Sequence, residues 1–217
     1  VVRYHILQFE AKSMQYVMKT YPCKFPSRGL HRTYRGLAFD TSGEFAIGGT
    51  DAGDVMIFSM RNTVFRTRMT MCASGISSLL KAENDTYYVG GGDGTIKKIM
   101  GTDRSWKILA EGKIPGRIVS LSLSAKGDQL VAGVASGAIF CVNSTNLKYA
   151  LVSESHTTTI NDVSFGTDSG VFATIAEDTT VRIWDLSKYR VLCKVTGSCP
   201  GRRCILDTKN GQVITGW

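Results

Sequence analysis

Three residues in the C-terminal half of the chain carry side chains that could do chemistry together: His156, Thr174 and Asp178. An imidazole has two ring nitrogens, so one histidine can bridge a carboxylate and a hydroxyl. Such a trio acts as a catalytic triad where the hydroxyl meets a substrate, and as a static hydrogen-bond relay where it is buried. The elements that hold the three residues therefore decide their role.

The rest of the chain offers few other reactive groups. It has no HExxH or GxSxG motif and only three histidines, His5, His31 and His156. The six cysteines form no C-x-x-C pair, which favours free thiols over disulfides or zinc. The glycine-rich run at 89–94 precedes another strand-like segment rather than a helix, so it is not a phosphate loop. We expect no enzyme, no cofactor, no metal and no small-molecule substrate.

A repeat of 42 residues organises the chain. One apolar column falls at Leu37, Leu79, Leu121, Val163 and Ile205. Three residues earlier runs a second column, Tyr34, Ile76, Ile118 and Ile160, which Arg202 breaks in the last copy. Eleven residues later we expect a column of small residues, at Gly48, Gly90, Ala132, Thr174 and Gly216.

Each unit contains four short apolar or alternating runs separated by turn residues, which is typical of β-strands. Four strands per ~42 residues, with no helical pattern, predict an all-β fold, a β-propeller of four-stranded blades. The small column is expected because blades taper towards a central channel. A nucleophile in the second strand of such a blade would lie inside the sheet, out of reach of a substrate.

The repeat also predicts the domain boundaries. We expect whole blades at 34–69, 76–111, 118–153 and 160–195, the first half of a further blade at 202–217, and the last strands of a preceding blade with a linker at 1–33. This is a partial ring. Because the first residue is Val1 and not methionine, we expect a piece of a longer chain, with the missing part closing the ring.

The segment HTTTINDVSFGTDSGVFATIAEDTTVRIWD, residues 156–185, resembles a WD repeat. The resemblance places His156 before the first strand, Thr174 in the second, Asp178 in the next turn and Trp184-Asp185 at the end of the third. We therefore interpret His156, Thr174, Asp178 and Trp184 as a structural hydrogen-bond relay. The other units lose it: Cys72 stands in place of the histidine, and Phe58, Ile99 and Val142 in place of the tryptophan.

Charge and hydropathy limit the partners. The 26 Lys and Arg residues exceed the 18 Asp and Glu residues, giving a net charge of +8 that favours an acidic partner. Six basic residues lie where one blade leads into the next and predict a basic face: Arg32, Arg35, Lys113, Arg117, Arg202 and Arg203. Only Tyr34 adds an aromatic ring for stacking, which argues against nucleic acid. No apolar run approaches the ~18 residues of a membrane span, so we expect no membrane partner.

The order of degenerate units, from AIGGTDAGDVMIF through ISSLLKAENDTYYVGGGDGTIKKI and RIVSLSLSAKGDQLVAGVASGAIFCV to the intact unit and QVITGW, is similar to the junction of the two propellers in the cilia- and flagella-associated WD-repeat family. The segment 11–32 is longer than that family's connection, and no family contact residue can be placed here by motif. The resemblance implies a microtubule inner protein that binds tubulin and other inner proteins in the lumen of axonemal doublet microtubules and stabilises them. It also implies a place in the cytoplasm, in the cytoskeleton of the cilium or flagellum. The alternatives are a WD-repeat scaffold of another assembly, such as a ribosome-biogenesis complex, and a propeller hydrolase or lyase.

Overall fold

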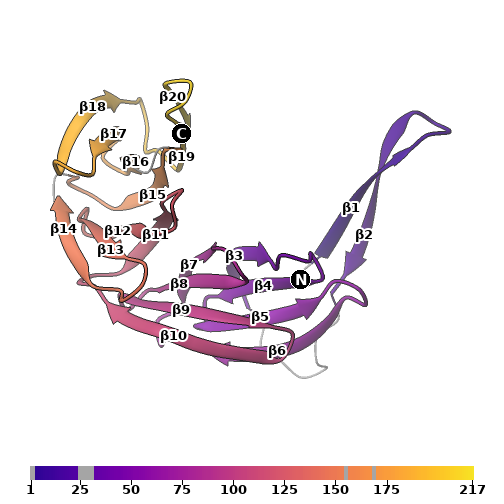
Figure 1. Ribbon diagram of the computed structural model, residues 1–217. Coiled ribbons are helices and arrows are strands. Elements are labelled where there is room, and N and C mark those ends of the chain that lie inside the picture. The colour runs from indigo at the N-terminus through magenta and orange to yellow at the C-terminus, as the bar shows by residue number, and fades with distance from the viewer. Residues whose placement is uncertain (1–2, 24–31, 154–155, 168–169) are drawn as a thin grey trace.

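The computed structural model describes residues 3–23, 32–153, 156–167 and 170–217. Within these ranges the chain forms β-strands and turns, and none of it is a helix long and apolar enough to span a membrane. The described strands make six antiparallel sheets. Four of these sheets are four-stranded, and these four follow one another around an open arc (Figure 1).

The four-stranded sheets follow chain order. The first contains β3 (Tyr34–Phe39), β4 (Phe45–Thr50), β5 (Asp54–Ser59) and β6 (Val64–Thr70). The second contains β7 (Ile76–Lys81), β8 (Thr86–Gly91), β9 (Thr95–Thr102) and β10 (Ser105–Lys113). The third contains β11 (Ile118–Leu123), β12 (Gln129–Val134), β13 (Ile139–Asn143) and β14 (Tyr149–Ser153). The fourth contains β15 (Ile160–Phe165), β16 (Val171–Ala176), β17 (Thr180–Asp185) and β18 (Arg190–Thr196).

Two shorter sheets flank these four. β1 (Arg3–Glu10) and β2 (Gln15–Pro22) form a hairpin that extends away from the arc (Figure 1), and β19 (Arg203–Asp207) pairs with β20 (Gln212–Gly216) at the other end. Most of the expected linker, residues 24–31, lies outside the described residues. That the hairpin ends a preceding blade stays a prediction.

The first strands of successive sheets form the inner wall of the arc: β3 contacts β7, β7 contacts β11, β11 contacts β15 and β15 contacts β19. Each sheet runs in order from this inner strand to its outermost strand. This arrangement is a partial β-propeller, and it confirms the predicted fold class.

The hydrophobic core lies between neighbouring sheets. One cluster combines Tyr88 and Ile96 of the second sheet with Leu121 and Leu130 of the third, all at most 3% exposed. Burying a large apolar side chain contributes about 1.5–3 kcal/mol, so these interfaces hold the blades together even where a unit lacks the polar relay.

Small residues allow the sheets to approach each other. A Cβ on Gly49 would lie 2.6 Å from Ile76 Cγ2 of the next sheet, and a Cβ on Gly133 would lie 2.6 Å from Ile160 Cγ2. Gly90 occupies the same place in the second sheet. A side chain at any of these three glycines would push the sheets apart, and of the three only Gly90 belongs to the predicted small-residue column.

The expected register of that column was wrong in two units. Leu79 pairs with Val89, and Ile205 pairs with Ile214, so neither faces the residue eleven positions later. The turn between the first two strands is one residue shorter in the second unit, and two residues shorter in the last, than in the first. Gly90 therefore aligns with Gly49 rather than with the residue before it.

Candidate functional site

The fourth sheet brings the four predicted relay residues together. His156 precedes β15, Thr174 lies in β16, Asp178 in the turn after it, and Trp184 in β17. His156 Nδ1 lies 2.9 Å from Asp178 Oδ2, and Nε2 lies 2.7 Å from Thr174 Oγ1. The Trp184 indole N–H donates to the same Thr174 oxygen at 2.8 Å.

Burial and hydrogen bonding set the protonation of the relay. Burial lowers the pKa of His156 and outweighs the opposing effect of Asp178, so the ring is neutral near pH 7. Burial alone would raise the pKa of the Asp178 carboxyl, but hydrogen bonds from Thr180 and His156 hold it at about 2. An ionised Asp178 accepts from the Nδ1–H of His156, which leaves Nε2 to accept the Thr174 hydroxyl proton.

The relay leaves no room for a reaction. The Thr174 and His156 side chains are fully buried. Both ring nitrogens of His156 and the hydroxyl oxygen of Thr174 have hydrogen-bond partners. A hydroxyl so placed cannot meet a substrate. The arrangement instead ties the loop before β15 to β16 and to the turn at Asp178.

The other units fill the same places with different groups. Cys72 Sγ donates to the Gly75 carbonyl at 3.1 Å, and burial raises the pKa of the thiol, so it stays neutral. Phe58, Ile99 and Val142 are completely buried where the fourth sheet has its tryptophan. These units thus rely on packing rather than on a polar relay.

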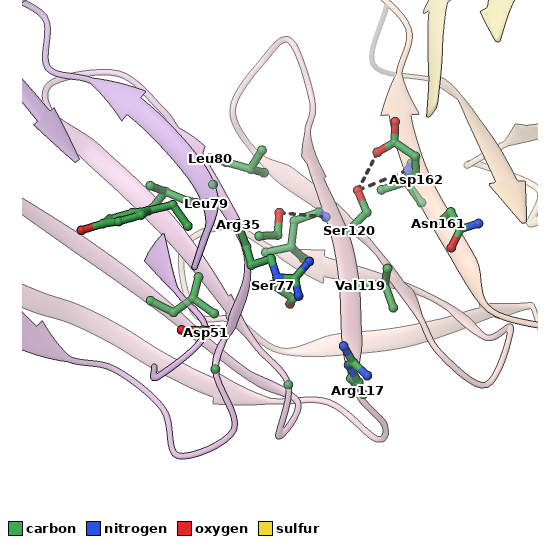
Figure 2. Close-up of a pocket in the computed structure, with 18 of the residues that line it drawn as sticks. Arg35, Asp51, Ser77, Leu79, Leu80, Arg117, Val119, Ser120, Asn161 and Asp162 are labelled. Atoms are coloured by element: carbon green, nitrogen blue, oxygen red, sulfur yellow. Dashed lines mark hydrogen bonds between the residues drawn. The ribbon is translucent and has the colours of Figure 1, made fainter. Parts of the chain in front are cut away.

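The inner wall of the arc lines an open cavity of about 850 Å³. One residue from each inner strand lines it at the same repeat position: Arg35, Ser77, Val119, Asn161 and Arg203. The adjoining position contributes Ser78, Ser120 and Asp162. Figure 2 shows this wall, with Ser120 hydrogen-bonded to Asp162 across two neighbouring inner strands.

These serines and Asp162 form a polar ladder that the sequence reasoning missed. The Ser120 hydroxyl donates to Asp162 Oδ1 at 2.8 Å, and its oxygen accepts the N–H of Val163 at 3.4 Å. Ser78 Oγ accepts the N–H of Leu121 in the same way. Each bond joins residues 42 or 43 positions apart. The recurrence of Ser78, Ser120 and Asp162 at the repeat period could therefore have predicted the ladder from the sequence.

The structure divides the six basic residues of the expected face. Arg35, Arg117 and Arg203 line the inner cavity. The other three, Arg32, Lys113 and Arg202, do not line it. Of these, Arg32 lies 3.9 Å from Asp54 and Arg202 lies 3.6 Å from Glu177. The six basic residues therefore do not form one continuous face of the cavity.

No group of three or more metal-ligating side chains converges within the described ranges.

Comparison with known proteins agrees with this architecture. The model of the family described as "WD domain, G-beta repeat" matches residues 148–185, the stretch that contains the relay. The computationally designed Ika8 protein has the same fold, with a TM-score of 0.67 over 84% of this chain and 55% of its own, at 17% identity. Residues 148–185 thus form a WD repeat, within a chain whose fold is a partial β-propeller.

Its similarity to curated proteins extends beyond the intact repeat. It is 28% identical over 196 residues to Cilia- and flagella-associated protein 52 of Chlamydomonas reinhardtii, which covers 87% of this chain. The Bos taurus protein of that name is 25% identical over 207 residues, covering 92% of this chain. The chain spans about a third of the length of these relatives, 31% and 32%. WD repeat-containing protein 90 of Homo sapiens is 29% identical over 91 residues, which is 42% of this chain and 5% of that protein.

Proposed function

We propose that this protein is a non-catalytic WD-repeat scaffold of cilia and flagella, with its place in the axonemal cytoskeleton. One observation carries the proposal: the similarity to Cilia- and flagella-associated protein 52 covers 87–92% of the chain. The generic WD match covers only 148–185, so the wider similarity includes the degenerate blades. The buried relay supports the non-catalytic part, because its hydroxyl and imidazole face each other.

We further propose that it binds tubulin and other inner proteins in the lumen of doublet microtubules and stabilises the microtubule wall. The net charge of +8 supports an acidic partner. A row of blades joined by packed interfaces is rigid, which suits a protein that braces a wall. Nucleic acid fits less well, because Tyr34 is half-buried and its hydroxyl donates to Met56 Sδ at 3.2 Å.

Fractionation of the full-length protein tests the cellular part. Axonemes are extracted with high salt, and the protein is followed by antibody. We expect it to stay with the doublet microtubules; nucleolar enrichment would instead favour a ribosome-biogenesis scaffold and refute the proposal. Cross-linking of isolated doublets tests the finer part. Cross-links to luminal tubulin surfaces are expected, and cross-links confined to the outer surface would contradict luminal binding.

A further inference from the structure

Three arginines line the cavity on the inner wall of the arc. Arg35 in β3 and Arg203 in β19 occupy the same repeat position on the first and last inner strands, four repeats apart. Arg117 comes directly before β11, the inner strand midway between them, and Figure 2 shows Arg35 and Arg117 on the same wall. We propose that this wall binds an acidic peptide segment of a partner protein, which rests on the proposed scaffold function but not on its location.

The arginines keep charge available for a ligand. Arg35 and Arg117 are exposed, and neither has a carboxylate within 4.0 Å among the described residues. Arg203 lies 3.3 Å from Asp162, but its side chain is 74% exposed. Exposed ion pairs are weak, so Arg203 can also turn to a carboxylate in the cavity.

The acidic side chains of the wall already have partners. Asp162 accepts from the Ser120 hydroxyl at 2.8 Å and from the N–H of Cys204 at 3.1 Å, besides its ion pair with Arg203. Asp51 accepts from the N–H of Thr33 at 3.2 Å. Three cations against two engaged carboxylates leave the wall net positive.

Serines that line the same cavity add neutral donors. Ser78 Oγ accepts the N–H of Leu121, and Ser122 Oγ accepts the N–H of Phe165 at 3.0 Å. Each hydroxyl keeps a proton for which the described residues supply no acceptor. A ligand carboxylate could therefore accept from both an arginine and a serine, which strengthens the pairing.

An acidic peptide fits this wall better than a nucleic acid. The cavity of about 850 Å³ is within the usual range of ligand sites, roughly 300–1,000 Å³. Single-stranded nucleic acids stack their bases on open aromatic faces. The one aromatic residue of the wall, Tyr34, instead packs edge-on against Phe58 at 6.2 Å between ring centroids. Guanidinium groups suit carboxylates because they can bind both oxygens at once.

Fluorescence anisotropy on the full-length protein tests the proposal, with a fluorescein-labelled oligoglutamate peptide as the probe. The test variant is Arg35→Gln with Arg117→Gln. The control is Arg61→Gln with Arg190→Gln, which removes the same charge from exposed residues that do not line the cavity. A charged hydrogen bond contributes about tenfold in affinity, so we expect the test pair to weaken binding by about tenfold or more and the control pair by less than about twofold.

Three results would overturn the proposal. One is unchanged binding by the test variant, with a melting curve that matches the wild type. Another is equal weakening by both pairs, which would mean that only net charge matters. The third is stronger binding of an oligothymidylate competitor, which would assign the wall to nucleic acid. This assay does not depend on where the protein resides, so its failure would leave the ciliary scaffold to the fractionation test.

Discussion

Replacing His156 with alanine should destabilise the fourth sheet strongly. The ring is completely buried, and its two strongest hydrogen bonds join Nδ1 to Asp178 Oδ2 at 2.9 Å and Nε2 to Thr174 Oγ1 at 2.7 Å, besides a longer contact of Nδ1 with the Thr180 hydroxyl at 3.3 Å. Alanine removes both and leaves space where the imidazole packed near the Trp184 ring, 6.4 Å away between centroids.

The magnitude follows from the two bonds. A hydrogen bond to a charged group contributes about 1.5–3 kcal/mol and a neutral one about 0.5–1.5 kcal/mol. Asp178 keeps the Thr180 hydroxyl at 2.6 Å, and Thr174 keeps the Trp184 indole, so neither partner is left without a hydrogen bond. We expect a loss of about 2–3 kcal/mol, or a melting temperature lower by roughly 4–12 °C for a domain of this size.

Thermal unfolding followed by circular dichroism measures this loss, and His5→Ala is the matched control. His5 Nδ1 lies 2.9 Å from the Thr20 hydroxyl, a similar bond, but at an exposed site on the hairpin. Its removal should change stability by no more than about 0.5 kcal/mol.

A double-mutant cycle makes the reasoning refutable. Thr174→Val removes the hydroxyl shared by His156 and Trp184. If the relay acts as a unit, the combined variant should cost less than the sum of the single variants by about 0.5–3 kcal/mol. An unchanged melt for His156→Ala, or strictly additive losses, would refute the relay as a stabilising unit.

Three further predictions concern pH, packing and the inner ladder. Burial lowers the pKa of His156, so below about pH 6.5 the unfolded state binds more protons than the folded state. Stability should therefore fall as the pH drops through about 6.5. In urea titrations the His156→Gln variant should show a smaller fall. Gly133→Ala should cost about 1–3 kcal/mol in thermal melts through contact with the next sheet, whereas Gly170→Ala, which has open space, should not. Ser120→Ala should cost about 1–3 kcal/mol because it removes the Ser120 hydroxyl bond to the buried Asp162 carboxylate, which keeps the Cys204 N–H, and an unchanged urea midpoint would contradict the ladder.

Local pattern was enough to predict the strands. Alternating apolar residues and turn residues depend on near neighbours in the chain, so the 42-residue period predicted four-stranded blades and a partial propeller. The relay was predictable for the same reason: His156, Thr174 and Asp178 lie within one unit, and their chemistry suits a buried bridge. The small-residue column was predicted less well, because turn lengths shifted the pairing of Leu79 and Ile205.

Residues from different blades could be placed only by the tertiary structure. Arg35, Arg117 and Arg203 share a wall because successive inner strands are arranged around one cavity. Arg32 and Arg202 lie elsewhere, each beside a carboxylate. The direction of each side chain follows from strand register and from the packing of the next sheet, neither of which is local. The sequence alone determined the blades, and the packing of one blade on the next decided which charges face the centre of the arc.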